Sequence, residues 1–339
     1  MSDQLNIAVV GATGVVGETM LDILSKRKFP VGNIFALASE RSIGKTVLFG
    51  NRKLKVLDLA TFDFAAVDIA LFSAGASVSN IFAPKASLAG CIVIDNTSRF
   101  RYEDDIPLVI TEVNPEKIKD YKKRGIIANP NCSVMQMLVA LKPIYDAVGI
   151  KRINVATYQA VSGAGKTAIS ELIHQTSSLL NGRPLDLKGS KQIAFNAIPH
   201  IDEFQDNGYT KEEMKMVWET TKILNDDNIV VNPTAVRIPV FYGHSEAVHI
   251  ETKKKISSAD VCKLLKNAPG VKLINGLETG KYPTAVTEGS GKDSVYVGRV
   301  REDISHPSGI NMWIVSDNIR KGAALNSVQI AEILVRKYL

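Results

Sequence analysis

The sequence predicts an α/β protein: a doubly wound parallel sheet followed by a second domain of α+β type. Short apolar runs alternate with helical segments over the first 130 residues, and a glycine-rich turn joins the first run to the first helix. Such alternation is typical of a parallel sheet with helices on both faces. A cysteine at the start of a helix, Cys132, follows directly, and 339 residues leave room for a second domain.

The composition is that of an ordinary globular protein, with 45% hydrophobic and 22% charged residues. The net charge is +6, and the basic residues are scattered apart from Lys253-Lys254-Lys255, which we interpret as a solvated strand end rather than a nucleic-acid patch. No apolar run is long enough to span a membrane, and Met1 to Asn6 resembles no signal or transit peptide. Three widely spaced cysteines predict a reducing, cytoplasmic location without disulfides or a metal site.

The first strand is predicted at Leu5 to Val10, and a helix through Leu24 follows the turn between them. That turn has the pattern Gly-x-x-Gly-x-x-Gly, formed by Gly11, Gly14 and Gly17. Glycines let the backbone approach a pyrophosphate, and the helix N-terminus favours its negative charge. The strand, turn and helix together therefore predict a dinucleotide site.

A second strand is predicted at Asn33 to Ser39. In dinucleotide-binding folds, the residues after this strand determine whether NAD or NADP binds. An acidic residue there binds the ribose hydroxyls of NAD, and an arginine accommodates the 2′-phosphate of NADP. Glu40 and Arg41 are both present. We favour NADP because serines on both sides of Arg41, Ser39 and Ser42, also donate to phosphate; a solvated loop is the alternative.

Further buried strands complete the predicted sheet. We expect them at Ala66–Phe72, Cys91–Asp95, Leu108–Ile110 and Ile126–Ala128. The first is followed by small residues, Ser73-Ala74-Gly75-Ala76, at the edge where ligands bind in open α/β sheets.

Cys132 lies where a loop becomes the helix Ser133 to Val148. A thiol at a helix N-terminus meets unpaired backbone N–H groups and the positive end of the helix dipole, and both favour the nucleophilic thiolate. From spacing alone, the alternative that Cys132 is a buried structural cysteine is equally supported.

Two later segments carry candidate polar groups. The strand Ile153 to Val161 contains Gln159 and leads into Ser162-Gly163-Ala164-Gly165-Lys166-Thr167, which resembles a P-loop but has Ala160 in place of its first glycine, so we reject an ATPase. A helix at Thr210–Leu224 has a capping box from Thr210 to Glu213. Its charged residues have the spacing of a solvated ion-pair face, with a binding site as the alternative: Glu212, Lys215, Glu219 and Lys222.

The last third adds a buried charge and a histidine. Arg237 lies within a predicted strand, Thr234 to Phe241, where a charge needs a partner or a ligand. His244 follows a glycine in the turn before the next strand, and this setting suits a general base. We expect the final helix, Ala323 to Tyr338, to pack on the first domain.

Five motifs occur together in one order, and on them the chain resembles the aspartate-β-semialdehyde dehydrogenases over nearly its full length. The resemblance implies a Rossmann-type domain at 1–130, completed by a C-terminal helix at 318–339, and a catalytic and dimerisation domain at 131–317. The motifs are Asn131-Cys132-Ser133, Tyr158 to Gly165, Glu212 to Met216, Arg237-Ile238-Pro239-Val240 and Gly243-His244-Ser245.

This resemblance also implies the roles of the site residues. Cys132 attacks the aldehyde of L-aspartate-4-semialdehyde, His244 acts as acid and base with a pKa near neutrality, and Gln159 orients the acyl intermediate. Arg237 binds the substrate carboxylate, Glu212 its amino group, Arg99 and Lys215 the phosphate, and Asn131 lines the substrate site. The NADP(H) contacts are Gly11, Thr13, Gly14, Val15, Val16, Ser39, Arg41, Ser42, Ser73, Gly75, Ser162, Gly163 and Asn318.

On this resemblance the enzyme reduces L-4-aspartyl phosphate with NADPH, reversibly, in lysine, threonine, methionine and diaminopimelate biosynthesis, as a homodimer or homotetramer. Two rivals remain. N-acetyl-γ-glutamyl-phosphate reductase shares the thiol chemistry, but its substrate has no free amino group for Glu212. An inactive NADP-binding sensor is disfavoured because Cys132, Gln159 and His244 are all present.

Overall fold

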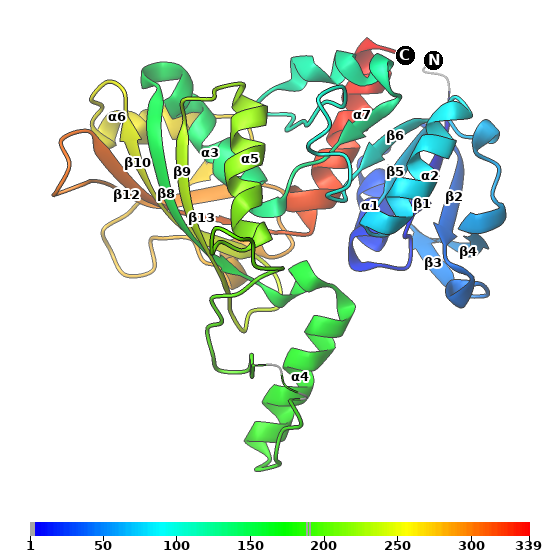
Figure 1. The fold of residues 1–339 in the computed structure, drawn as a ribbon, viewed down its shortest axis with the longest axis horizontal. Coiled ribbons are helices and arrows are strands. Elements are labelled where there is room, and N and C mark those ends of the chain that lie inside the picture. Colours follow the sequence, from blue (N-terminus) through cyan, green and yellow to red (C-terminus); the bar gives the residue numbers. More distant parts are fainter. Residues whose placement is uncertain (1–3, 188, 190) are drawn as a thin grey trace. The chain divides into compact units, whose positions relative to one another are not determined.

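The computed structural model describes residues 4–187, 189 and 191–339 (Figure 1). The chain forms two compact units, which are described separately. Unit 1 comprises Met1–Asn131 and Ala323–Leu339, and unit 2 comprises Cys132–Gly322. In the described part of the chain, no helix combines the length and the apolar character needed to cross a membrane.

Unit 1 contains a seven-stranded sheet in the order β3-β4-β2-β1-β5-β6-β7. All neighbours run parallel except the β3–β4 hairpin. The strands are β1 (Leu5–Val10), β2 (Val31–Ala38), β3 (Thr46–Phe49), β4 (Arg52–Asp58), β5 (Ile69–Phe72), β6 (Ile92–Asp95) and β7 (Ile126–Ala128). Its helices are α1 (Val15–Lys26), α2 (Ala76–Leu88) and α7 (Asn326–Lys337).

The C-terminal helix α7 packs into the core of unit 1. Val328, Ile330 and Leu334 are buried in the same apolar cluster as Met20 and Leu24 of α1. Outside the core, Arg27 forms an ion pair with Glu332 of α7. The two ends of the chain therefore share one hydrophobic core, whose burial is the main source of stability for this unit.

Unit 2 is built on a six-stranded mixed sheet in the order β11-β12-β13-β10-β8-β9. The strands are β8 (Ile150–Gln159), β9 (Val230–Arg237), β10 (His244–Thr252), β11 (Val271–Leu273), β12 (Val295–Glu302) and β13 (Gly309–Ser316). The helices are α3 (Cys132–Val148), α4 (Lys166–Leu180), α5 (Lys211–Leu224) and α6 (Ser258–Asn267). Helix α3 packs on β10, β13, β12 and β8, with α5 and α6 beside it.

The predicted fold class, Rossmann-type plus α+β, is confirmed, but one predicted strand is wrong. Leu108 to Ile110 forms only an isolated bridge from Leu108 to Ala128. The side chain of Asn114 takes the place of a neighbouring strand, since its Nδ2 donates to the Leu108 carbonyl and its Oδ1 accepts from the Ile110 N–H.

Several predicted boundaries also move. Strand β5 begins at Ile69, because Asp63 caps a short 3₁₀ turn at Phe64–Ala66. Strand β9 begins at Val230 and ends at Arg237, earlier than predicted at both ends. It contains Pro233, which is tolerated because β9 is an edge strand.

Candidate active site

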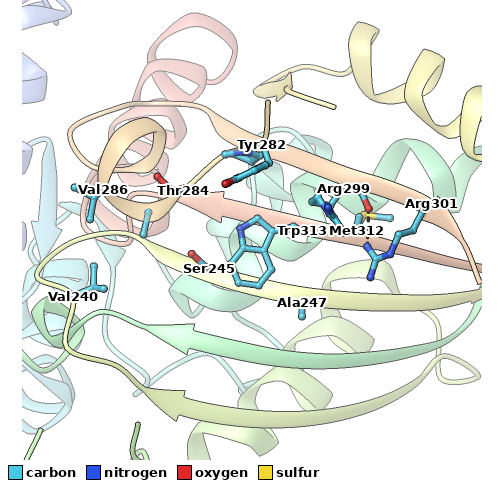
Figure 2. Close-up of a pocket in the computed structure, with 12 residues that line it drawn as sticks. Val240, Ser245, Ala247, Tyr282, Thr284, Val286, Arg299, Arg301, Met312 and Trp313 are labelled. Carbon is cyan, nitrogen blue, oxygen red and sulfur yellow. Dashed lines mark hydrogen bonds between the residues drawn. The ribbon is translucent and has the colours of Figure 1, made fainter. Parts of the chain in front are cut away.

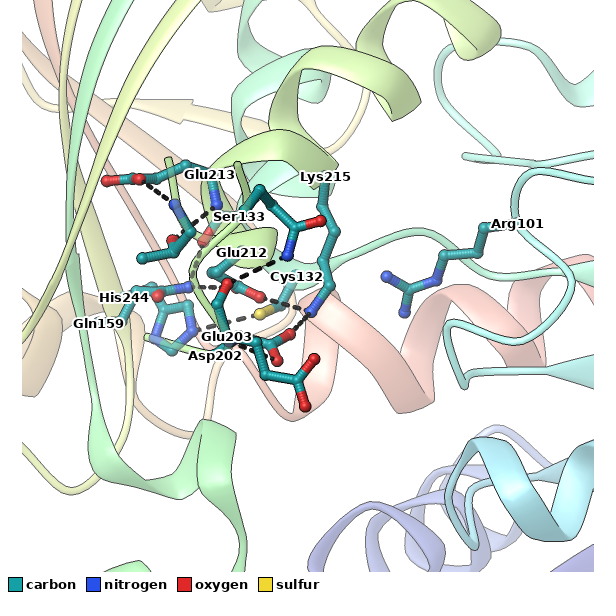
Figure 3. A network of polar contacts seen from close by, with 12 residues as sticks. Arg101, Cys132, Ser133, Gln159, Asp202, Glu203, Glu212, Glu213, Lys215 and His244 are labelled. Atoms are coloured by element: carbon teal, nitrogen blue, oxygen red, sulfur yellow. Dashed lines mark hydrogen bonds and ion pairs between the residues drawn. The ribbon is translucent and has the colours of Figure 1, made fainter. Parts of the chain in front are cut away.

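Unit 2 brings the predicted thiol and imidazole together. Cys132 is the first residue of α3 and His244 the first residue of β10, which packs against that helix. The Cys132 Sγ lies 3.2 Å from the His244 Nε2 (Figure 3). This hydrogen-bond distance is the relation expected between a nucleophile and its acid–base partner.

The other ring nitrogen of His244 fixes its tautomer. The Ala160 N–H donates to Nδ1 at 3.0 Å, so Nδ1 carries a lone pair and the proton of the neutral ring is on Nε2, facing the sulfur. His244 is fully buried. Burial, reinforced by the positive charge of Arg237, lowers the pKa of His244 to about 3, although Glu212 opposes this. The expectation of a near-neutral pKa is therefore wrong, because desolvation of the imidazolium dominates.

We predict that His244 does not titrate in the neutral range. Its folded-state pKa is depressed below that of the unfolded chain, so the ring stays neutral until the pH approaches about 3. The ring C–H resonance of His244, assigned by its loss in His244→Asn, is expected to keep a constant shift from about pH 8 to pH 5. An inflection near pH 6.5 would show an ordinary, solvated imidazole.

Gln159, at the end of β8, links the thiol helix to α5. Its Nε2 donates to the Ser133 hydroxyl at 2.8 Å and to the Glu212 carboxylate at 2.9 Å. Its Oε1 is buried and has no partner among the described residues. The amide is thus held firmly on one side and retains a free acceptor.

Glu212 and Lys215 lie in this network rather than on a solvated face. Lys215 is 2.8 Å from Glu212 and 2.7 Å from Asp202, and the Lys215 and Glu212 side chains are only 12% and 9% exposed. Burial alone lowers the pKa of Lys215, but the two carboxylates outweigh it and raise the pKa. Glu219 of the same helix is completely buried. The solvated ion-pair interpretation is therefore wrong.

A capping box places Glu212. The Thr210 hydroxyl accepts from the Glu213 N–H, and the Glu213 carboxylate accepts from the Thr210 N–H at 2.7 Å. The second oxygen of Glu213 accepts from the Ala235 N–H of β9 at 2.9 Å. The first turn of α5 is therefore anchored to the sheet, next to the end of β9 where Arg237 lies.

Arg237 is a largely buried cation with donors to spare. Its Nη1 donates to the Ala160 carbonyl at 2.7 Å, and no other bond of its guanidinium occurs within the described residues. Burial lowers the pKa of Arg237, while Glu212 and Cys132 counter this in part. A guanidinium has five N–H donors, so several remain to bind a carboxylate.

Three of the predicted cofactor residues also lie in unit 2. The Asn318 Oδ1 accepts from the Gly243 N–H at 2.9 Å, and its Nδ2 donates to the Ser162 hydroxyl at 3.0 Å. A Cβ on Gly163 would lie 3.2 Å from the Arg237 Nη1 and 3.4 Å from the His244 Cε1. These residues therefore pack around the start of β10 and the imidazole.

The predicted dinucleotide turn of unit 1 is tightly packed. Gly11 has φ +85°, and a Cβ there would lie 2.9 Å from the Ala74 N. A Cβ on Gly17 would lie 2.2 Å from the Gly11 carbonyl oxygen, so this glycine is required by the turn itself. Gly14 precedes α1 without a capping side chain, which leaves the N–H groups of the first turn available to an anion.

The remaining predicted cofactor residues surround this turn. Thr13 Oγ1 lies 3.4 Å from Ser42 Oγ, which brings the turn close to the loop after β2, with its exposed Arg41. Ser73 donates to the Val10 carbonyl at the end of β1. Val15 and Val16 begin α1, Ser39 precedes the 3₁₀ turn Glu40–Ser42, and Gly75 precedes α2.

Two predicted substrate residues also belong to unit 1. Arg99 donates to Asn80 and forms an ion pair of 2.7 Å with Glu103. Asn131 is buried, with 7% exposure. Residues 4–187, 189 and 191–339 contain no group of three or more metal-binding side chains close enough to hold an ion.

Sequence reasoning missed several groups of the unit 2 network. Ser133 and Asp202 contact the predicted residues directly, and both backbone groups of Ala160 hold the site. Gly322 is also required, since a Cβ there would lie 2.8 Å from the Cβ of Cys132. Ser133 was signalled by its place next to the cysteine, whereas nothing local marks Asp202 or Gly322.

Comparison with known proteins bears on both units. Two family models match, "Semialdehyde dehydrogenase, NAD binding domain" over residues 6–121 and "Semialdehyde dehydrogenase, dimerisation domain" over residues 141–321. An aspartate-semialdehyde dehydrogenase of Legionella pneumophila is 64% identical, over 100% of this chain and 98% of its own. One from Bacillus subtilis is 49% identical over 98% of each chain.

Solved structures agree with these relatives. An aspartate semialdehyde dehydrogenase II of Vibrio cholerae, solved in complex with ASA, has a TM-score of 0.97 and 61% identity over 100% of both chains. The enzyme of Candida albicans, solved with NADP, has a TM-score of 0.74 and 25% identity over 98% of both chains.

A parallel nucleotide-binding sheet in one unit, a thiol beside a buried imidazole in the other, and the two family matches together define a semialdehyde dehydrogenase of the NAD-binding and dimerisation type. Among these, the identities over the whole chain are decisive. The chain belongs to the aspartate-semialdehyde dehydrogenase family and is an enzyme with that activity.

Proposed function

We propose that this enzyme interconverts L-4-aspartyl phosphate and L-aspartate-4-semialdehyde with NADP(H) through a thioester on Cys132. The physiological direction is the reduction, which serves lysine, threonine, methionine and diaminopimelate biosynthesis. The observation that carries the proposal is the 3.2 Å contact between the Cys132 sulfur and the His244 Nε2, beside the Gln159–Glu212–Lys215 network. Three free cysteines are consistent with the proposed cytoplasmic location.

The chain's own residues account for the chemistry of the oxidative direction. The Cys132 thiolate bonds to the aldehyde carbon, and the carbonyl electron pair moves to oxygen. The Nε2–H of His244 donates to the sulfur beforehand and to this oxyanion afterwards, so the neutral imidazole stabilises the negative charge without being ionised. Loss of hydride restores the carbonyl as a thioester, and phosphate then displaces the sulfur to give the acyl phosphate.

Substrate binding follows from the buried charges. We assign the substrate carboxylate to Arg237, whose guanidinium has donors to spare, and the α-amino group to Glu212. Lys215 and Arg99 are the proposed phosphate ligands, and Asn131 is a proposed substrate contact. Phosphate binding to Lys215 must compete with Asp202 and Glu212, which hold its ammonium at 2.7 and 2.8 Å.

The cofactor site in unit 1 fits NADP(H), which accepts or returns the hydride when bound. The uncapped first turn of α1 after Gly14 suits a pyrophosphate, and Arg41 and Ser42 suit a 2′-phosphate. We therefore assign cofactor binding to residues 1–130 with the C-terminal helix, and the chemistry to residues 131–317.

The test of this function is the reduction of NADP by purified protein with L-aspartate-4-semialdehyde, in the presence and absence of phosphate. We expect turnover that depends on phosphate and is much slower with NAD. Activity only with N-acetylglutamate semialdehyde would identify the acylated-substrate reductase instead, and no activity with either aldehyde would identify a binding protein.

We further propose that the enzyme is a homodimer, or a dimer of dimers, that uses the sheet face opposite α3. Ser245, Ala247 and Trp313 point away from the catalytic face and line a pocket of about 720 Å³ on that side (Figure 2). The ring centroids of Trp313 and Tyr158 lie 5.4 Å apart on this face. The match to a dimerisation domain over residues 141–321 supports a second copy as the occupant.

The dimer proposal predicts that Trp313→Glu weakens self-association. The substitution removes a large aromatic ring from the interface and adds a charge that has to be desolvated there, which costs several kcal/mol. Light scattering after size exclusion is expected to give a monomer mass for the variant and at least twice that for the wild type. Lys151→Glu, at an exposed position of β8, is the control, and an unchanged mass for Trp313→Glu would place the interface elsewhere.

A further inference from the structure

A second layer of polar side chains lies one step deeper than the catalytic pair in unit 2. Gln136 follows Cys132 by four residues on α3, so the two share a helix face. Glu246 follows His244 by two residues and therefore shares its face of β10. Thr157 of β8 lies directly opposite Glu246 in the antiparallel register. Gln136 is 1% exposed, and Thr157 and Glu246 are 0% exposed.

Several polar side-chain atoms of this layer form no hydrogen bond with the described residues. Both carboxyl oxygens of Glu246, both amide atoms of Gln136 and the hydroxyl of Thr157 lack a hydrogen bond to any described residue. Buried polar groups of folded proteins are almost always paired. Five such atoms from three neighbouring elements are therefore available to one another.

The burial of Glu246 favours the neutral form of its carboxyl. Burial raises its pKa well above the ordinary value, and the only opposing group is the facing amide of Gln136. Thr157 and Ile314 face it from β8 and β13. Cys132 on α3 and His244 on β10 are titratable residues on the same faces. A protonated carboxyl offers one donor and an acceptor, which match the acceptor and donors of a primary amide.

We propose that Glu246 is a positioning residue, whose protonated carboxyl pairs with the Gln136 amide and so holds the first turns of α3 against β10. Cys132 lies one turn before Gln136, and His244 lies two residues before Glu246. The pairing therefore sets the distance from the sulfur to the Nε2, and this role rests on the proposed thiol chemistry.

Three variants test the proposal. Glu246→Leu removes the pairing, Glu246→Gln keeps a neutral hydrogen-bonding group, and Val248→Ala is the control, a buried truncation two residues further on the same face of β10. The readouts are kcat, KM and the rate at which iodoacetamide alkylates the Cys132 peptide. Alkylation needs no substrate, so it reports on the pair even if the proposed reaction fails.

Glu246→Leu is expected to lower kcat and the alkylation rate by about 10- to 100-fold, with KM changed less than about twofold, because a small displacement of reacting groups slows the chemistry. Glu246→Gln is expected to restore both rates to within about threefold of wild type. Should Glu246→Leu fail to fold, Gln136→Leu replaces it, with the same expected losses.

The protonation state has its own readout. The unfolded carboxyl ionises near about pH 4.3, whereas burial raises the pKa of the folded one, so the proposed pairing persists to a higher pH. Its contribution to stability is therefore fully present below that pH and is lost as the pH rises. The denaturant concentration at the unfolding midpoint is measured for the wild type and for Glu246→Gln at each pH. Relative to the variant, the wild-type midpoint is expected to decrease as the pH is raised from 5 to 8.

Two results would overturn the proposal. Normal kcat and alkylation in Glu246→Leu, with a loss of stability like that of Val248→Ala, would mean that the residue only fills the core. Equal losses in Glu246→Gln and Glu246→Leu would mean that the site requires an ionised carboxylate.

Discussion

Cys132→Ala is expected to abolish phosphate-dependent turnover, with a loss of roughly 10⁴-fold or more in kcat, because it removes the sulfur on which the proposed thioester forms. The fold should survive, since the change removes one sulfur atom at the start of α3. Coupled absorbance of NADPH with the semialdehyde and phosphate measures the effect.

The matched control uses another thiol of the same unit. Cys262 lies in α6, is partly exposed and accepts a hydrogen bond from Asn275. Cys262→Ala is expected to retain wild-type activity. Comparable activity in both alanine variants would show that the reaction does not proceed through Cys132.

Arg237→Leu is expected to lower kcat/KM by roughly two to three orders of magnitude. The substrate carboxylate would lose a desolvated charge pair worth about 2–5 kcal/mol. Arg237→Lys should recover only part of this loss, because an ammonium cannot form the planar bidentate pair.

Two comparisons distinguish specific binding of the substrate carboxylate by Arg237 from a general effect of removing a positive charge. Arg152→Leu removes an exposed arginine of β8 and is expected to leave kcat/KM unchanged. A substrate analogue that lacks the α-carboxylate should be processed equally by the wild type and Arg237→Leu. If the wild type instead keeps a large advantage on the analogue, Arg237 acts on some other group.

Local sequence patterns identified the elements that begin the site. The Gly11 to Gly17 turn and the capping box at Thr210 each follow from contacts within a few residues, and the structure has both. Such signals depend on local backbone chemistry, which is why they can be recognised without a fold.

Charge spacing on α5 was misleading because a helical ion pair looks the same in solvent and in a protein interior. Only the tertiary contacts of Lys215 with Asp202 and of Glu212 with Gln159 distinguish the two. The resemblance to a known family predicted site roles for Glu212 and Lys215, since Glu212 to Met216 is one of the motifs that carry it.

The electrostatic state of His244 could not be read from the sequence either. A glycine-preceded histidine suggested a titrating base, but its ring is buried, its Nδ1 accepts from Ala160, and Arg237 lies nearby. The polar layer of Gln136, Thr157 and Glu246 could not be predicted for the same reason. Its members lie on one helix and two strands, and they come together only when these elements pack.

The most direct test of the thioester mechanism is a single-turnover experiment without phosphate. Wild-type enzyme mixed with NADP and L-aspartate-4-semialdehyde is followed by rapid absorbance, then quenched in acid for peptide mass spectrometry. We expect a burst of NADPH that approaches one equivalent per active site, and an aspartyl group on the Cys132 peptide that disappears when phosphate is added. A burst without acylated Cys132, or acylation of a different residue, would contradict the mechanism.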